Sequence, residues 1–174
     1  LASHRAGWPT ALPDHFVPHV ATLTPEWLGS QGIRALVCDL DNTLVPWHSL
    51  EIPDPVRGWV ETLTAAGIPA CIASNTLNFD RLARIADGLG MAHVPANARK
   101  PGTVGIERAL ALLGREAHLA AMVGDQFFTD MIAGRRAGLT TVLVNPLASR
   151  EFVGTRMISR PLERLVLGDR RPTQ

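Results

Sequence analysis

The chain has 174 residues, 46% of them hydrophobic, and its 17 basic and 16 acidic residues give a formal net charge of +1. This length and composition predict one globular domain with a sizeable core and exclude a disordered chain, while the small net charge and an aromatic content of 5% argue against a nucleic-acid partner. With no apolar run of about 18 residues, no signal-peptide core and only two cysteines, the sequence predicts a cytoplasmic protein without a membrane span or a disulfide framework.

Short apolar runs alternate along the chain with amphipathic helical stretches. Strands are expected over residues 33–38, 68–73, 91–94, 119–123 and 140–144, with helices between them over 54–67, 78–90, 103–114 and 128–137. Asp54 is expected to cap the first of these helices and Asn78 the second. The alternation predicts an α/β fold, a three-layer sandwich with a five-stranded parallel sheet between helices. Right-handed crossovers restrict the strand order to a few choices; with the first strand central, the order is 3-2-1-4-5 or an equivalent one, numbered along the chain.

The predicted domain has an arm at each end. We expect residues 1–30 to form an N-terminal arm, 31–147 the core and 148–174 a C-terminal arm. The C-terminal arm holds six arginines against three acidic residues; it is open to interpretation as a docking helix with a solvated end or as a segment attracted to an anionic membrane. We expect three aromatic residues of the N-terminal arm either to pack against the sheet or to contact lipid headgroups: Trp8, Phe16 and Trp27.

Polar side chains follow three of the predicted strands. Asp39 and Asp41 come directly after the first strand, Ser74 after the second and Asp125 after the fourth, with Asp130 a little further on. In the predicted order these strand ends meet at one edge of the sheet, where such folds bind ligands. A cluster of carboxylates suits a hard cation such as Mg²⁺. Lysine occurs once in the chain, at position 100, and its ammonium group suits a phosphoryl group bound beside Ser74.

These residues stand in four motifs that resemble those of the haloacid dehalogenase (HAD) superfamily, in the same order. The motifs are Asp39-Leu-Asp41-Asn-Thr43, Ser74-Asn75, Lys100-Pro101, and Gly124-Asp125-Gln126 with Thr129-Asp130. Further stretches, such as Val-Pro-Trp-His after the first motif and Gly-Asp-Gln-Phe-Phe-Thr-Asp at the fourth, resemble the YqeG-type branch (subfamily IIIA). The resemblance runs from about residue 16 to residue 167, and that branch is similar to mitochondrial phosphatases that act on phosphatidylglycerophosphate.

The resemblance implies a role for each carboxylate. Asp39 would be the nucleophile that takes the phosphoryl group as an aspartyl-phosphate. Asp41 would protonate the leaving alcohol and then activate water. Mg²⁺ would be held by the carboxylates of Asp39 and Asp125 and the backbone carbonyl of Asp41, with Asp130 as a nearby or alternate ligand.

The resemblance also implies how the phosphoryl group is bound. Ser74 and Lys100 would hold its oxygens as charge redistributes in the transition state. Asn75 and Thr43 are expected on the substrate side of the site, and at Asn75 the backbone amide can matter more than the side chain.

The spacing of the motifs leaves no room for a cap domain, because residues 41–74 and 75–100 each hold one loop, one helix and one strand. The predicted site is therefore open. An open site suits a large substrate or a lid from a second copy of the chain, and the loop of Pro46, Trp47 and His48 offers another means of closure.

We therefore expect a Mg²⁺-dependent phosphomonoester hydrolase that acts through an aspartyl-phosphate, with phosphatidylglycerophosphate as the leading substrate by resemblance. Two alternatives remain open at this point: a phosphatase for soluble sugar or nucleotide phosphates, and a non-catalytic binding protein on the same fold. The expected partners are a phosphorylated substrate with a lipid headgroup, the inner face of a membrane in peripheral contact, and a second copy of the chain.

Overall fold

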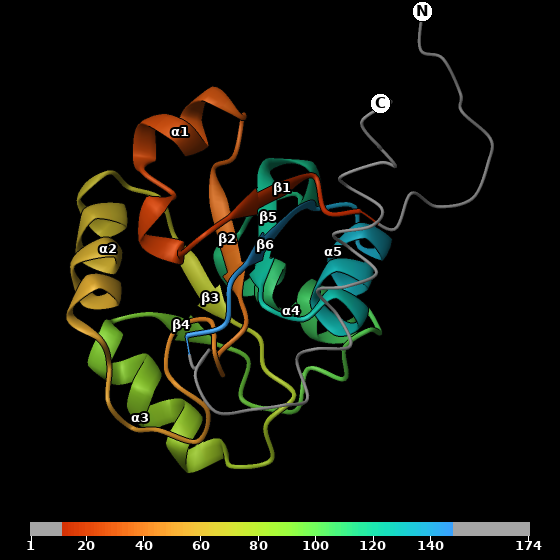
Figure 1. Cartoon of the computed structure of the whole chain (residues 1–174). Helices are drawn as coiled ribbons and strands as arrows, with labels where there is room; N and C mark the ends of the chain where they lie inside the picture. The colour runs from red at the N-terminus through yellow and green to blue at the C-terminus, as the bar shows by residue number, and fades with distance from the viewer. Residues whose placement is uncertain (1–11, 148–174) are drawn as a thin grey trace, which may run out of the picture.

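A computed structural model describes residues 12–147, and Figure 1 shows how their helices surround a central sheet. The arginine-rich C-terminal arm expected over residues 148–174 lies outside the described residues, as does Trp8. No helix of residues 12–147 is both long and apolar enough to cross a bilayer.

The sheet has six parallel strands in the order β1-β6-β5-β2-β3-β4. The strands are β1 (His15–Val17), β2 (Ala35–Cys38), β3 (Ala70–Ile72), β4 (Ala92–His93), β5 (Ala120–Gly124) and β6 (Thr140–Val144). The five predicted strands are all present, and their order 3-2-1-4-5 is confirmed. The prediction of five strands is corrected to six by β1, which pairs with β6 at the edge of the sheet.

Helices cover both faces of the sheet, which makes the predicted three layers. The helices are α1 (Pro25–Ser30), α2 (Asp54–Ala65), α3 (Phe79–Leu89), α4 (Val104–Leu113) and α5 (Ile132–Arg136), with short turns η1 (Val20–Thr22), η2 (Ala117–Leu119) and η3 (Phe127–Met131). Alternate residues of β2 face opposite sides. Leu36 and Cys38 pack in one core with α1, α2 and α3. Ala35 and Val37 pack in the other with α4 and α5.

Of the two predicted helix caps, one is confirmed by the structure and the other is not. The Asn78 side chain accepts a hydrogen bond from the Arg81 backbone N–H at 3.0 Å, so it caps α3 as predicted. The capping role of Asp54 was wrong: Asp54 is itself the first helical residue of α2, Pro53 precedes it, and the cap makes no side-chain hydrogen bond. Pro53 and Pro55 flank Asp54, so their fixed φ angles set the helix start without a side-chain cap.

The strand β1 ties part of the expected N-terminal arm into the sheet. The Asp14 carboxylate just before it accepts hydrogen bonds from the Thr141 backbone N–H at 2.8 Å and from the Thr141 hydroxyl at 2.7 Å. Trp27 of α1 packs on the core beside β1, with its ring 5.0 Å from that of His15 in an edge-to-face arrangement, whereas Phe16 is 58% exposed. The stretch from residue 12 to residue 30 is therefore built into the fold.

Candidate active site

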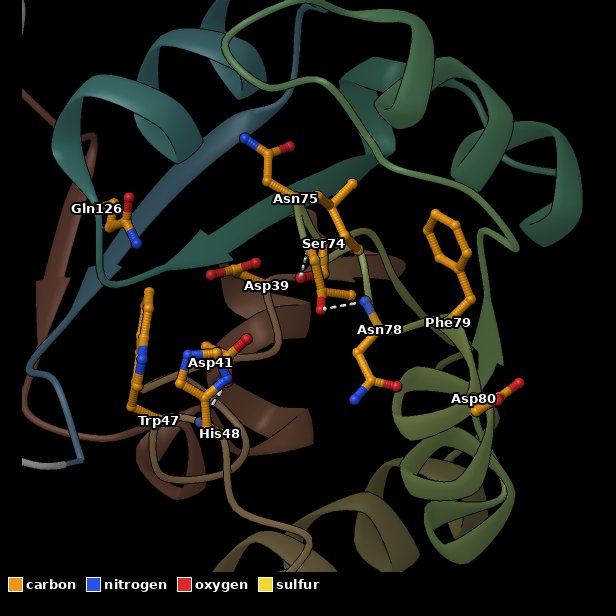
Figure 2. Close-up of a pocket in the computed structure, with 12 residues that line it drawn as sticks. Asp39, Asp41, Trp47, His48, Ser74, Asn75, Asn78, Phe79, Asp80 and Gln126 are labelled. Carbon is orange, nitrogen blue, oxygen red and sulfur yellow. Dashed lines mark hydrogen bonds between the residues drawn. The ribbon is translucent and has the colours of Figure 1, made fainter.

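The first motif turns sharply at the carboxyl end of β2. The Asp39 backbone N–H donates to the Val123 carbonyl at 2.9 Å, so Asp39 still lies in register with β5. Asn42 then adopts a positive φ of 59°, which asparagine tolerates better than most residues. Its N–H donates to the Val45 carbonyl at 2.7 Å, closing the turn. The turn lets Asp39 and Asp41, two residues apart, reach the same cavity (Figure 2).

A pocket of about 840 Å³ opens at the edge of the sheet where the sequence placed the site. Its lining includes Asp39 and Asp41 from the first motif, Ser74 and Asn75 from the second, and the stretch from Thr76 to Asp80 that leads into α3. Trp47 and His48 reach it from the loop before α2. The stretch between Asp41 and Ser74 contains α2 and β3 and no cap domain, as expected, so the pocket stays open.

Lys100 lies beneath the pocket between two carboxylates. Its Nζ is 2.7 Å from Asp39 Oδ1 and 2.7 Å from Asp130 Oδ1, and only 1% of its side chain is exposed. Burial alone would lower the pKa of Lys100, but the charges of Asp130 and Asp39 outweigh burial and raise that pKa well above its usual value. Lys100 is therefore a fixed cation in contact with Asp39.

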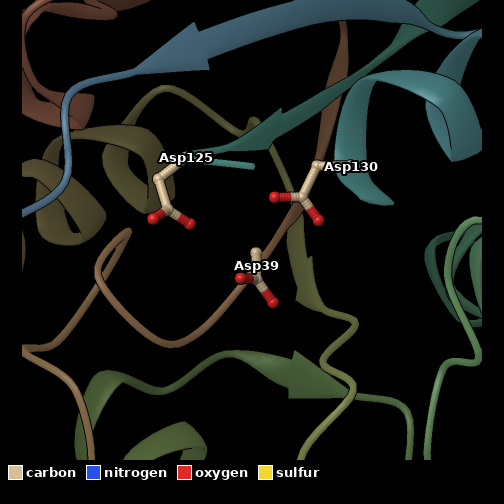
Figure 3. Close-up of side chains that lie close together, drawn as sticks. All are labelled: Asp39, Asp125 and Asp130. Atoms are coloured by element: carbon tan, nitrogen blue, oxygen red, sulfur yellow. The ribbon is translucent and has the colours of Figure 1, made fainter. Parts of the chain in front are cut away.

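Asp39, Asp125 and Asp130 form a carboxylate cluster, with one oxygen from each lying within 4.8 Å of the others (Figure 3). Burial, together with the charges of Asp39 and Asp130, raises the pKa of Asp125 to about 7. Asp125 Oδ1 is buried without a hydrogen-bond partner among the described residues. Three acidic groups facing one another and an unpaired buried oxygen fit a divalent cation with oxygen ligands.

Gly124 and the wide turn η3 place Asp130 in this cluster. A Cβ at position 124 would collide with the Asp130 carboxyl group, so glycine there lets the buried acid approach β5. The η3 turn (Phe127–Met131) has π-helical hydrogen bonding, a form that is frequent at functional sites. Asp130 Oδ2 accepts from the Gln126 N–H at 3.0 Å, which fixes its second oxygen.

The structure brings Ser74 into the pocket and uses the Asn75 side chain elsewhere. Ser74 is buried at the pocket floor, and its hydroxyl accepts from the Thr76 N–H at 3.1 Å. The Asn75 amide group donates to the Lys100 carbonyl at 2.8 Å and accepts from the Lys100 N–H at 2.8 Å. Asn75 therefore holds the backbone that carries Lys100. Thr43 is buried outside the pocket lining, and its hydroxyl has no partner among residues 12–147.

Arg81 is a site residue that the sequence reading missed. It lies in α3, 6% exposed, and forms an ion pair with Asp41 at 2.8 Å. A signal for it exists in the sequence, because position 81 lies four residues before Ile85 and eight before Leu89, on the apolar stripe of the helix. A charged residue on the buried face of a helix needs a partner.

The loop before α2 also contacts Asp41. The backbone N–H of His48, at a positive φ of 56°, donates to Asp41 Oδ1 at 3.1 Å. Trp47 packs edge-to-face on the His48 ring at 4.9 Å and is 52% exposed, so it forms part of the pocket wall without being a core residue. The contact that the loop makes with Asp41 is thus a backbone one.

Comparison with known proteins supports the resemblance of the four motifs to those of the HAD superfamily. A family model described as HAD-hydrolase-like matches residues 97–146, which include Lys100, Asp125 and Asp130. A protein of Bacillus subtilis strain 168, named the probable phosphatase YqeG, is 35% identical over 156 residues that cover 90% of this chain and 89% of that protein. The chain belongs to the YqeG-type branch of the HAD phosphatases.

Other similar proteins extend this family assignment. Phosphatidylglycerophosphate phosphatase 1 of Arabidopsis thaliana is 32% identical over 149 residues, or 80% of this chain and 42% of that protein. Its namesake from Chlamydomonas reinhardtii is 31% identical and covers 86% of this chain and 59% of the algal protein. A crystal structure of an uncharacterized protein from Listeria monocytogenes serotype 4b shares the fold, with a TM-score of 0.52 at 18% identity over 75% of this chain and 99% of that one.

Proposed function

We propose that this YqeG-type HAD phosphatase is a Mg²⁺-dependent phosphomonoester hydrolase that forms an aspartyl-phosphate on Asp39. The observation that carries the proposal is the position of Asp39, which lines the open pocket, contacts the Lys100 ammonium at 2.7 Å and shares the carboxylate cluster with Asp125 and Asp130. The carboxylates of Asp39 and Asp125 and the backbone carbonyl of Asp41 would hold Mg²⁺, with Asp130 beside them. When bound, the ion supplies charge that offsets the phosphoryl oxygens.

Residues of the chain carry out the nucleophilic attack, the stabilisation of charge and the proton transfers. An oxygen of Asp39 attacks phosphorus, and Lys100 and Ser74 stabilise the phosphoryl oxygens as negative charge moves onto them. Asp41 gives a proton to the leaving oxygen and later takes one from the attacking water. Asn75 holds Lys100 in place through its two hydrogen bonds to the Lys100 backbone. A contact between Thr43 and the substrate stays a prediction.

We propose phosphatidylglycerophosphate as the substrate, presented at a membrane surface. Two similar proteins carry the name of that activity and are 32% and 31% identical to this chain. The pocket is open, and three large apolar side chains in its wall are well exposed: Trp47 at 52%, Leu77 at 80% and Phe79 at 43%. Exposed apolar groups around a polar pocket suit a lipid with a charged headgroup. Peripheral contact with the inner membrane face follows from this substrate.

The proposal is tested by phosphate release with and without Mg²⁺, from p-nitrophenyl phosphate and from dispersed phosphatidylglycerophosphate in parallel. We expect metal-dependent release that is faster from the lipid than from the small ester, and its loss in Asp39→Asn. Release from small esters and sugar phosphates alone would replace the lipid by a soluble substrate. No release from any of them, or retained turnover in Asp39→Asn, would contradict the covalent mechanism.

A second copy of the chain as a lid over the open pocket also stays a prediction. Sedimentation of the purified protein with and without a phosphate analogue measures it directly. A monomer under both conditions would contradict the lid and leave the proposed role of Asp39 unaffected.

A further inference from the structure

The guanidinium of Arg81 joins α3 to the first motif and to the loop before α2. Nη2 donates to Asp41 Oδ1 at 2.8 Å and Nη1 donates to Asp41 Oδ2 at 3.2 Å. Nε donates to the Ser49 carbonyl at 2.9 Å. The two segments that Arg81 reaches lie 40 and 32 residues away in the chain, so the contacts are tertiary.

The surroundings of Arg81 define how it is held. Arg81 is 6% exposed, and burying a guanidinium is costly unless charged and hydrogen-bonded groups replace its water. A two-pronged contact with a carboxylate replaces that water and also fixes the plane of the carboxylate, which a lysine ammonium does not do. The backbone of Arg81 is fixed as well, because its N–H donates to Asn78 Oδ1 in the cap of α3. The helix therefore sets the orientation of the Asp41 carboxyl group.

The hydrogen bonds to Asp41 leave one of its oxygens less occupied than the other. Oδ1 accepts from Arg81 Nη2 and from the His48 N–H, whereas Oδ2 accepts from Arg81 Nη1. A carboxylate has about four acceptor positions, so one remains on Oδ2. Asp41 lines the pocket, so its carboxyl group is accessible to a bound substrate.

We propose that Arg81 is a positioning residue that holds the Asp41 carboxyl group toward the leaving oxygen of the substrate, with Oδ2 as the oxygen that delivers the proton. This inference rests on the proposed function. In the step, Asp39 forms a bond to phosphorus while the bond from phosphorus to the leaving oxygen breaks. That oxygen keeps the electron pair and takes the proton that Asp41 carries at the free position of Oδ2 when the substrate binds, which leaves Asp41 as a carboxylate. Arg81 contacts neither the phosphorus nor the leaving oxygen; it acts through Asp41, to which it hydrogen-bonds, and pairs with the carboxylate that remains.

The role predicts a change in leaving-group dependence, because an ester whose leaving oxygen is strongly basic needs the proton more than one whose leaving oxygen is weakly basic. The experiment compares p-nitrophenyl phosphate with phenyl phosphate. The p-nitrophenolate group leaves readily without a proton, whereas the more basic phenolate group needs one. In Arg81→Met, we expect the rate with phenyl phosphate to fall about tenfold more than the rate with p-nitrophenyl phosphate. Arg81→Lys keeps the charge without the two-pronged contact. Its ratio of the two rates should therefore lie between those of the unmodified protein and Arg81→Met.

The matched control is Arg84→Met, an exposed arginine on the same helix, which should leave the ratio of the two rates unchanged. A second control uses Asp41→Asn, which removes the proton donor. In that background, Arg81→Met should change the ratio by less than about twofold, because the two residues act as one unit.

The outcomes separate this inference from the function on which it rests. An equal fall with both esters in Arg81→Met and Arg81→Lys would show that Arg81 only stabilises the fold, and would overturn the positioning role. A large further change of the ratio in the Asp41→Asn background would overturn it as well. Absence of turnover in the unmodified protein would instead contradict the proposed function. Thermal unfolding shows which variants fold. If Arg81→Met does not fold, the comparison of Arg81→Lys with the unmodified protein tests the positioning role.

Discussion

At the scale of single residues, we expect Asp125 to make the stability of the metal-free protein depend on pH. Its pKa is raised from an ordinary value of 3.8 to about 7 in the folded chain. The folded state therefore binds the proton more tightly than the unfolded state, and stability falls as pH rises through the window between these two values. We expect a lower free energy of unfolding at pH 7.5 than at pH 5 in the presence of a chelator, measured by urea denaturation.

Replacing the carboxyl group separates Asp125 from other titrating groups. Asp125→Asn should remove most of this decline and raise the free energy of unfolding at pH 7.5 by about 1 kcal/mol or more. It should also remove stabilisation by Mg²⁺, whereas Asp87→Asn, an exposed carboxylate of α3, should change neither. A decline of undiminished size in Asp125→Asn would assign the pH dependence to another group, such as Asp130, whose pKa burial also raises.

Asn75 offers a second test at this scale, because its side chain makes two hydrogen bonds to the Lys100 backbone. Asn75→Asp keeps an acceptor for the Lys100 N–H and loses the donor to its carbonyl, and Asn75→Ala loses both. We expect a loss of about 1 kcal/mol in stability per bond, together with a lower kcat in the same order. Equal kcat values in all three proteins would show that the position of Lys100 does not depend on Asn75.

The sequence predicted which motif residues would lie together at the candidate site and missed Arg81, which stands in no motif. Asp39, Ser74 and Asp125 follow strands whose ends meet at one edge, so topology alone predicts that they meet. Arg81 lies in α3, 40 residues from Asp41, and no local pattern joins the two. The use of the Asn75 side chain on Lys100 was hidden for the same reason, because a contact between two loops depends on how both fold.

At the scale of elements, the junction of β5 and η3 has little room for added atoms. Gly124→Ala puts a methyl group where the Asp130 carboxyl group lies, so we expect a loss of about 1 to 3 kcal/mol in stability and weaker binding of Mg²⁺. Calorimetry measures both. The matched control is Gly58→Ala in α2, where an added Cβ meets nothing within 4 Å. That change should raise stability by about 0.5 to 1 kcal/mol. Unchanged metal affinity in Gly124→Ala would show that Asp130 does not depend on this junction.

Predictability differed between elements for a physical reason. The strands β2, β5 and β6 are apolar runs buried on both faces, and such runs are visible in sequence. The strand β1 has three residues, His15–Val17, with a proline directly after them. Its pairing with β6 comes from residues about 127 positions away, such as Asp14 with Thr141. A strand this short carries no periodic pattern, so its place had to come from the structure.

At the scale of the whole molecule, the exposed apolar side chains of the pocket wall should act in binding to lipid. Leu77 is 80% exposed, so Leu77→Ser removes apolar area from the surface without opening the core. We expect about five- to tenfold weaker binding to anionic vesicles, measured by co-sedimentation at low salt. Leu112→Ser is the matched control, since Leu112 is 56% exposed on α4 near the opposite end of the strands. Equal losses in both variants, or no binding by the unmodified protein, would contradict membrane contact through this face.

The pairing of β1 with β6 has a consequence for the molecule's behaviour in concentrated solution. Without residues 15–17, β6 would become the border of the sheet, with a row of unsatisfied backbone groups beside Val142, Leu143 and Val144. Such a border is a template on which a strand from another molecule can add, and repetition of that step leads to aggregates. The short β1 (His15–Val17), followed by Pro18, offers a far poorer template. These few residues therefore guard against self-association, and a shortened chain that begins after them should lose solubility before it loses the pocket.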